Sequence, residues 1–152
     1  MKDTAVLYYS KHHGNTEKVL RHLAAHYSID LYDVTGDAVP SLSDYKAVGF
    51  ASGVYMSNLH KSLFGQVSAH PELAGKPCFI VHTSGAPMGI YSGALAKSLT
   101  EQGADYLGTF RCRGFDTYGP LRLIGGIAKQ HPNQADLQKA EEFYKTTVLA
   151  AL

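Results

Sequence analysis

The sequence predicts an α/β fold in which a doubly wound five-stranded parallel sheet, in the order 2-1-3-4-5, carries helices on both faces. Short apolar runs alternate with helical patterns along the whole chain. Such alternation is typical of parallel sheets joined by right-handed crossovers. Residues 28–34 alone alternate apolar and polar side chains, as a half-exposed strand does. The order 2-1-3-4-5 places that strand at an edge.

Hydrophobic periodicity locates the remaining elements. Four apolar runs have the composition of buried strands: Thr4–Tyr9 and residues 47–52, 77–83 and 106–112. Helices are predicted where apolar side chains recur every three or four positions, at residues 19–27, 59–67, 91–102 and 137–148. A turn-rich linker, residues 36–43, separates the edge strand from the next strand.

The ends of these helices carry capping signals. Ser57 or Asn58 is expected to cap the second helix, and Pro132-Asn133 to open the last one. Gly103 follows the third helix, at a position where a left-handed glycine commonly ends a helix.

Composition describes one ordinary domain, residues 1–152. Hydrophobic residues make up 45% of the chain and charged residues 18%, as in a globular protein with a substantial core. The formal net charge of +1 argues against the clustered basic face of a nucleic-acid-binding protein. The sequence has no apolar stretch of membrane-spanning length and no signal-peptide core, so we expect a cytoplasmic protein without a membrane span.

The two cysteines are expected to be buried thiols. Cys78 begins one apolar run and Cys112 ends another, so parallel strands would place them at opposite ends. A disulfide between them is therefore not expected, and a reducing compartment is indicated.

The segment between the first strand and the first helix concentrates groups that bind phosphate. Its members are Ser10, Lys11, His12, His13, Gly14, Asn15 and Thr16. Hydroxyls, an amide and the N–H groups at a helix start all favour an anion there. The alternative is an ordinary turn in which Asn15 or Thr16 caps the helix. For Lys11 and His12 we expect side chains in solvent, with backbone contacts only; for His13 both arrangements stay open.

Other phosphate-binding loops do not fit this segment. Gly14 stands alone, so the dinucleotide pattern G-x-G-x-x-G is missing, and no G-x-x-x-x-G-K-[ST] nucleotide loop occurs. Neither cysteine lies here, which excludes a phosphatase-type nucleophile. We therefore expect the segment to hold a phosphate without hydrolysing it.

Three loops that follow central strands resemble those of the flavodoxins. They are residues 10–16 with their Gly-Asn-Thr, Ala51-Ser52-Gly53-Val54-Tyr55-Met56, and His82-Thr83-Ser84-Gly85. The resemblance covers most of the chain and implies a flavodoxin-like three-layer sandwich. It also implies noncovalent binding of flavin mononucleotide (FMN) and electron transfer. In the order 2-1-3-4-5 the loops meet at the switch point of the sheet, where ligands bind.

The resemblance also assigns a part of the cofactor to each loop. The first loop would hold the phosphate. Ring walls would come from aromatic or soft apolar side chains, in the order Tyr55, Met56, Tyr91 and Tyr118. The polar edge of the ring would meet the third loop, at Thr83, Ser84, Gly85 and Ala86. The second loop adds Ser52, Gly53 and Val54.

Two functions stay open at this point. The first is an electron carrier that serves a larger redox partner protein. The second is an FMN-dependent oxidoreductase acting on a quinone-like small molecule. Ser52-Gly53-Val54-Tyr55, followed by His60-Lys61-Ser62-Leu63, is similar to flavodoxin-domain enzymes that oxidise protoporphyrinogen with quinones. We favour the carrier, because the sequence offers no obvious acid–base pair. A phosphoacceptor receiver domain would need acidic residues where Ser10 and Ser52 stand.

The connection between residues 114 and 131 is longer than compact domains usually contain without a function. It leaves the fifth strand on the side of the three loops, so we expect it to contribute to the flavin rim or to a partner surface. The alternative is a packed excursion with a short helical turn at residues 121–124.

Overall fold

The computed structural model describes residues 2–11, 14–86, 89–115 and 123–152. At its centre is a parallel sheet in the order β2-β1-β3-β5-β6, which confirms the predicted order. The strands are β1 (Thr4–Tyr9), β2 (Ile29–Asp33), β3 (Ala47–Tyr55), β5 (Pro77–Ser84) and β6 (Asp105–Arg113). A short strand, β4 (Asn58–Leu59), folds back antiparallel onto the end of β3 and is absent from the sequence prediction.

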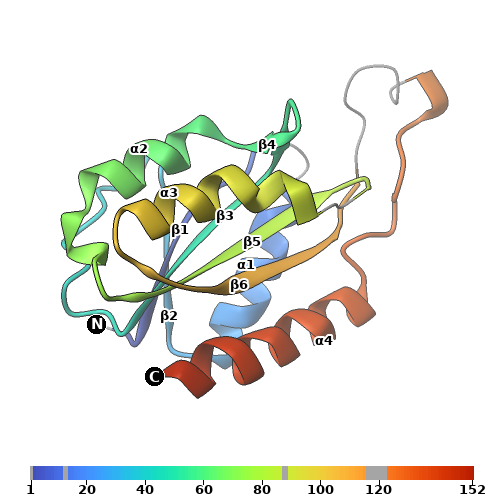
Figure 1. The fold of residues 1–152 in the computed structure, drawn as a ribbon. Helices are drawn as coiled ribbons and strands as arrows, with labels where there is room; N and C mark the ends of the chain where they lie inside the picture. Colours follow the sequence, from blue (N-terminus) through green and yellow to red (C-terminus); the bar gives the residue numbers. More distant parts are fainter. Residues whose placement is uncertain (1, 12–13, 87–88, 116–122) are drawn as a thin grey trace.

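Helices cover both faces of the sheet (Figure 1). On one face lie α1 (Asn15–His26) and α4 (Gln134–Phe143), and on the other α2 (Lys61–Ala69) and α3 (Gly93–Glu101). Shorter helical turns are η1 (Pro71–Leu73), η2 (Gly89–Ser92), η4 (Tyr144–Val148) and η5 (Leu149–Ala151). The result is the three-layer α/β sandwich that the alternating pattern predicts.

Alternation along the central strands divides the core into two halves. Val6 and Tyr8 of β1 pack on the side of α1 and α4, whereas Ala5 and Leu7 face α2 and α3. All four side chains are buried. Because both faces are covered, the central strands are continuous apolar runs. β2 is only partly buried, as expected of the edge strand.

One close approach within the sheet requires glycine. Gly49 of β3 lies beside Phe79 of β5 in the strand register. A Cβ atom at position 49 would lie 2.5 Å from the Phe79 ring, so the ring can pass over the strand only at a residue without a side chain. On its other side Phe79 reaches Phe143 and Tyr144, with ring centroids 6.3 and 6.1 Å away. The close approach therefore joins the sheet to the C-terminal helical segment.

Two of the predicted helix ends are confirmed. Asn133 caps α4 through a reciprocal pair of hydrogen bonds with Asp136, the arrangement known as a capping box. Gly103 follows α3 with a φ of 89°, a conformation that side chains disfavour.

The cap predicted for the second helix is wrong. His60, and neither Ser57 nor Asn58, caps α2, and its ring Nδ1 accepts a hydrogen bond from the Ser62 amide at 3.2 Å. The position predicted to begin this helix lies in β4 instead. The reason is a tight hairpin turn, in which Met56 and Ser57 adopt left-handed φ angles of 51° and 62°.

Cys78 and Cys112 are free and buried, as the sequence predicts. Burial raises the pKa of each thiol to about 12. In the part of the chain that the structure describes, no helix has the length and apolar character needed to cross a membrane.

A carboxylate ties the linker between β2 and β3 to the body of the protein. Glu72 Oε1 accepts a hydrogen bond from the amide of the buried Leu42 at 3.0 Å and lies 2.9 Å from His70 Nδ1. The hydrogen bond from His70, together with that from Leu42, lowers the pKa of the Glu72 carboxyl from 4.5 to about 2.

We expect Glu72→Gln to lower the free energy of unfolding by about 1–3 kcal/mol at neutral pH. Because the folded-state pKa of Glu72 lies below the unfolded value, its carboxylate stabilises the protein fully above about pH 5. That contribution is lost as the pH falls from 4.5 towards 2. The difference between wild type and variant should therefore shrink in acid, as measured by urea unfolding across this range.

Glu101→Gln provides the control, because it removes an exposed carboxylate that lies 3.9 Å from Lys97. Its effect on unfolding should be small at every pH. A difference between wild type and Glu72→Gln that stays constant from neutral pH into acid would contradict the proposed role of the carboxylate.

Candidate functional site

Three loops meet at the carboxyl edge of the sheet and line one pocket. β1, β3 and β5 end side by side, with Tyr9 beside Ser52 and Gly53 beside Thr83 in the register. The residues that line the pocket are Ser10, Lys11, Asn15, Thr16, Gly53, Val54, Tyr55, Thr83, Ser84, Gly114 and Phe115. The loops singled out in the sequence thus come together, and two residues from the end of β6 join them.

The first loop enters α1 without a side-chain cap. Gly14 is the N-cap residue, in a left-handed conformation with φ of 66°, and its carbonyl accepts a helical hydrogen bond from Lys18 N at 3.0 Å. The alternative in which Asn15 or Thr16 caps the helix is therefore wrong. The amides of Asn15 and Thr16 precede this bond, so the helix offers them no acceptor. An anion in the pocket could accept from both.

The polar side chains at the start of α1 form hydrogen bonds across the pocket floor. Asn15 Nδ2 donates to the Phe115 carbonyl at 2.8 Å. The hydroxyls of Thr16 and Thr83 share a hydrogen bond of 2.8 Å in which either can donate. Because only one of the two protons is used, the other can be donated to a ligand. Thr16 therefore links α1 to β5, and the pair of hydroxyls keeps one donor.

The other residues of the first loop differ in their surroundings. Ser10 Oγ accepts a hydrogen bond of 3.2 Å from an amide in the first turn of α1. Lys11 Nζ lies 3.6 Å from Asp33 Oδ2 of β2, and the Lys11 side chain is 53% exposed. His12 and His13 lie outside the described residues.

The second loop is the hairpin between β3 and β4. Ser52 is buried and does not line the pocket. Its hydroxyl donates to the Gly53 carbonyl at 2.6 Å and accepts from the His60 amide at 3.1 Å. Ser52 therefore braces the hairpin. Met56 is exposed at the hairpin tip and borders a neighbouring hollow.

Tyr55 forms an aromatic wall of the pocket that two other rings support. Tyr9 and His60 stack with their ring centroids 3.6 Å apart and their planes 4° apart. Tyr55 stands edge-on to both, at 5.5 and 5.2 Å. Burial, with the charge of Lys61, lowers the pKa of His60, so this imidazole is neutral near pH 7. Sequence reasoning missed the cluster, because the hairpin alone brings Tyr9 and His60 together.

The third loop places an unpaired hydroxyl in the pocket. Ser84 Oγ is buried and has no hydrogen-bond partner among the residues that the structure describes. Such a group costs stability unless a ligand or water satisfies it. Thr83 lines the pocket beside it, whereas Gly85 and Ala86 do not. Ser84 is therefore the side chain that points most directly to a bound molecule.

His82, two positions earlier in β5, is also buried without a partner in the described part of the chain. Burial, followed by the charge of Arg111, lowers the pKa of His82 to about 4. Tyr91 packs edge-on against this imidazole, with ring centroids 6.3 Å apart. Tyr91 does not line the pocket, so its placement does not match the predicted ring wall. Tyr118 lies outside the described residues.

Gly114 and Phe115 complete the pocket, and sequence reasoning did not name them as cofactor contacts. The Gly114 amide donates to the Ser84 carbonyl at 2.9 Å, which extends the pairing of β5 and β6. A Cβ atom at position 114 would lie 2.6 Å from Asn15 Nδ2. The missing side chain therefore leaves room for the amide that reaches the Phe115 carbonyl. In the sequence, the one sign of this role is that a glycine closely follows the fifth predicted strand.

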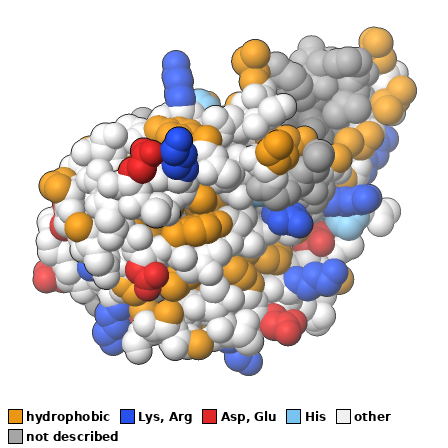
Figure 2. All heavy atoms as spheres, in the orientation of Figure 1, with side chains coloured by type: hydrophobic (Ala, Val, Ile, Leu, Met, Phe, Trp, Pro, Cys, Tyr) orange, Lys and Arg blue, Asp and Glu red, His pale blue; other side chains and the backbone are white. Residues whose placement is uncertain are grey.

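Large apolar side chains are exposed on segments that leave the carboxyl ends of the strands: Met56, Ile90, Leu123 and Ile124. Figure 2 shows hydrophobic side chains gathered at this end of the molecule, beside the grey atoms. Residues 116–122 lie outside the described part of the chain. The expected role of the 114–131 connection at the flavin rim therefore stays a prediction.

The pocket lining is suited to binding an anionic ligand. It offers helix-terminal amides, an unpaired hydroxyl and a flat aromatic wall. Lys11 and Tyr55 are the titratable groups among the described residues that line it. This combination of donors and an aromatic wall suits a ligand in which an anionic group is attached to a flat ring.

Comparison with known proteins agrees with this geometry. The sequence model of the flavodoxin domain family matches residues 6–111. An uncharacterized protein of Methanocaldococcus jannaschii is 36% identical over 143 residues, which span 93% of this chain and 95% of that protein.

Two solved structures have a similar fold. The two-electron reduced flavodoxin of Megasphaera elsdenii has a TM-score of 0.62 at 18% identity, over 90% of this chain and 96% of that one. General stress protein 14 of Treponema denticola, solved in complex with FMN, has a TM-score of 0.67 at 8% identity, over 94% and 98%. At these identities the likeness shows the fold alone.

We expect Gly114→Ala to destabilise the protein by about 1–3 kcal/mol, because the added methyl group must displace the Asn15 side chain. The hydrogen bond from Asn15 to Phe115 would then be lost. Urea unfolding of the variant measures the effect.

Gly65→Ala is the matched control, since a Cβ atom at position 65 in α2 would meet nothing within 4 Å. This change should be neutral or stabilise the protein by up to about 1 kcal/mol. If Gly114→Ala proved as stable as Gly65→Ala, the tight contact between Gly114 and Asn15 would be refuted.

Proposed function

The chain belongs to the flavodoxin domain family, and on that premise we propose that it binds FMN noncovalently and carries electrons between redox partners. The observation that carries the proposal is the pocket at the ends of β1, β3 and β5. It combines helix-terminal amides, the unpaired Ser84 hydroxyl and the Tyr55 wall. FMN, when bound, would supply reversible electron transfer. The protein's own residues would bind, orient and shield it.

The phosphate would be held by residues 10–16. The amides of Asn15 and Thr16 lie at the positive end of α1, where an anion is favoured. The unused hydroxyl proton of the Thr16–Thr83 pair adds a donor, and hydrogen bonds to a charged acceptor are the stronger ones. Lys11 contributes a positive charge at the pocket lining. Neutral donors and the helix dipole would thus do most of the binding.

The flavin ring would lie against Tyr55. Tyr9 and His60 fix the Tyr55 ring before a ligand arrives, so binding would cost little side-chain entropy. The Ser84 hydroxyl would meet a polar atom of the ring edge and gain the hydrogen-bond partner that it lacks among the described residues. The residues present therefore fit FMN. The amides at the start of α1 and the Ser84 hydroxyl can donate to its polar atoms, and the Tyr55 ring can pack against its flavin ring.

The open surroundings of the pocket favour a carrier. Apolar side chains at Met56, Ile90, Leu123 and Ile124 are exposed on the segments around the carboxyl edge. Exposed apolar groups of this kind commonly mark a surface for another protein. The described pocket lining also has no pair of carboxylates or imidazoles that could act as acid and base. We propose that electrons pass at this edge to a partner protein.

A second candidate, an FMN-dependent oxidoreductase, is favoured by one observation. A hollow adjoins the pocket at Tyr55, and its lining is Tyr55, Met56, Asn58, Leu59, His60, Lys61 and Phe64. The hollow is mostly apolar and includes the neutral imidazole of His60. It could accept a small flat molecule such as a quinone or a porphyrinogen.

We expect Ser84→Ala to weaken FMN binding about tenfold, because the variant lacks the hydroxyl that would pair with the ring edge. The unfolding free energy of the cofactor-free protein should stay the same or rise, since an unpaired buried group is removed. Titration of the cofactor-free protein with FMN, followed by flavin fluorescence, and urea unfolding measure the two effects.

Ser68→Ala, an exposed position in α2, is the control and should change neither quantity. Riboflavin, which has no phosphate, should bind wild type at least about 100-fold more weakly than FMN does. Equal affinity for riboflavin and FMN would refute the phosphate loop. Failure of FMN to bind at all would overturn the proposed function.

The two candidate functions differ in their response to a soluble quinone. For a carrier, the rate at which the reduced holoprotein is reoxidised should rise linearly with quinone concentration, because no quinone site exists. Phe64→Leu, a change in the hollow, should leave that rate unaltered. Stopped-flow absorbance measures the rate. Saturation in wild type that weakens in Phe64→Leu would favour the oxidoreductase instead.

A further inference from the structure

Two histidines one helical turn apart on α1 face a glutamate of α4. His22 Nε2 lies 2.8 Å from Glu141 Oε1, and His26 Nδ1 lies 3.8 Å from the same oxygen. The two imidazole centroids are 4.8 Å apart. Among the described residues, His22, His26 and Glu141 are the three potential metal ligands that lie together. It lies at the C-terminal end of α1, whereas the pocket lies at its N-terminal end.

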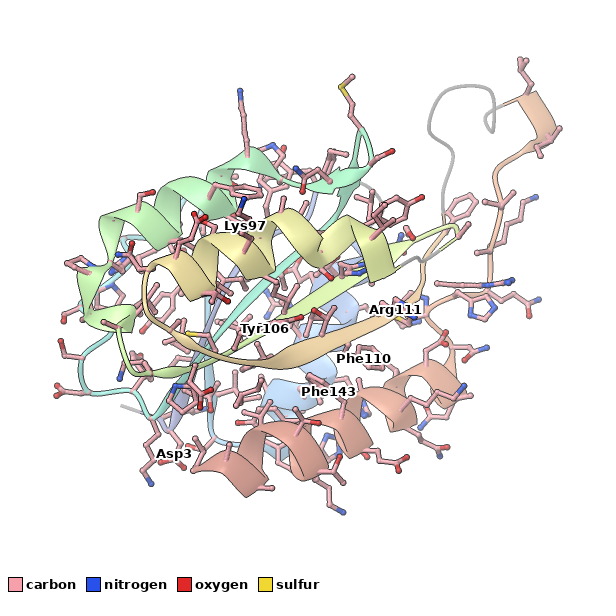
Figure 3. All side chains as sticks on the ribbon, in the orientation of Figure 1. Asp3, Lys97, Tyr106, Phe110, Arg111 and Phe143 are labelled. Carbon is pink, nitrogen blue, oxygen red and sulfur yellow. The ribbon has the colours of Figure 1, made fainter. Side chains whose placement is uncertain are left out.

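The fold holds these side chains in place from both helices. Residues four apart lie on the same face of a helix, so His22 and His26 project together from α1. Glu141 precedes Phe143, whose ring packs against Phe110 of β6 with centroids 5.9 Å apart. Figure 3 shows Phe110 and Phe143 between the strand and α4. The carboxylate is thus carried by a helix that is anchored to the sheet.

We propose that His22, His26 and Glu141 form a binding site for a divalent transition metal ion of the zinc class. Two imidazole nitrogens and one carboxylate oxygen are ligands that Zn²⁺ prefers, with water in the remaining position. Helical spacing of four between the histidines is the arrangement that known zinc helices use.

The distances in the structure suit this assignment. The three ligand atoms lie within 4.8 Å of one another, and tetrahedral zinc with bonds near 2.1 Å separates its ligands by about 3.4 Å. Small side-chain rotations reach that geometry. His26 Nδ1 now lies 2.9 Å from the His22 carbonyl oxygen, a contact that a metal bond would replace. The side chains of His22, His26 and Glu141 are 20%, 54% and 30% exposed, so an ion can enter from solvent.

Other histidine–carboxylate pairs show what distinguishes this group. His70 lies 2.9 Å from Glu72, and His131 lies 2.6 Å from Asp136. Each of these is a single contact between one imidazole and one carboxylate within one short segment of chain. At α1 and α4 a second imidazole faces the same carboxylate, and the ligands come from residues more than a hundred positions apart. A metal here would crosslink α1 to α4 and stabilise the folded state by mass action.

The test uses full-length protein without a histidine tag, stripped of metal by a chelator and measured with and without FMN. Calorimetric titration with Zn²⁺ should show one equivalent bound, and Co²⁺ should give the visible absorption of a tetrahedral N/O site. His26→Gln should weaken Zn²⁺ binding about 100-fold. This residue is exposed, and its replacement leaves the His22–Glu141 contact intact, so the variant should fold. Zn²⁺ should raise the melting temperature of wild type and not that of His26→Gln.

His70→Gln is the control, because it removes an imidazole from a pair that lacks a third ligand, and it should bind Zn²⁺ as wild type does. Glu141→Gln should lose binding as His26→Gln does. Equal Zn²⁺ affinity in wild type and His26→Gln, or loss of binding in His70→Gln, would overturn the site. FMN binding is read separately, so failure of either proposal leaves the other standing.

Discussion

Parallel pairing of β1, β3 and β5 is the interaction on which the rest of the structure depends. It sets Tyr9 beside Ser52 and Gly53 beside Thr83, so three loops from distant parts of the sequence start at the same edge. Most of the pocket lining follows from that alignment, and Gly114 and Phe115 join it from the end of β6. The hydrogen bond between the hydroxyls of Thr16 and Thr83 then connects α1 to the carboxyl end of β5, which fixes the helix start that would meet a phosphate.

The hairpin of β3 and β4 adds the second constraint. It turns the chain back so that His60 stacks on Tyr9, and the hydroxyl of Ser52 holds the turn from inside. The aromatic wall therefore depends on the path of the backbone through the hairpin as well as on the aromatic residues themselves. Tyr55 depends on this support, since the hairpin places His60 beside it and the end of β1 places Tyr9 there.

The sequence predicted the strand order and the three loops because hydrophobic periodicity and crossover handedness leave few alternatives. Local signals also sufficed at Asn133 and Gly103, where one residue determines a helix end. Prediction failed at the hairpin, since Met56 and Ser57 adopt left-handed angles without the glycine or asparagine that usually announces them. The place of His60 in the aromatic cluster arises from tertiary contacts with Tyr9 and Tyr55, which no local pattern records.

Burial of the two thiols determines how the protein responds to oxidants. Cys78 and Cys112 have pKa values raised to about 12 by burial, and the thiolate is the form that attacks peroxides and disulfides. At neutral pH both thiols are therefore protonated. Both sulfurs are thus protected from oxidants for as long as the sheet and its helices remain packed. Oxidation of either cysteine would first require this part of the fold to open.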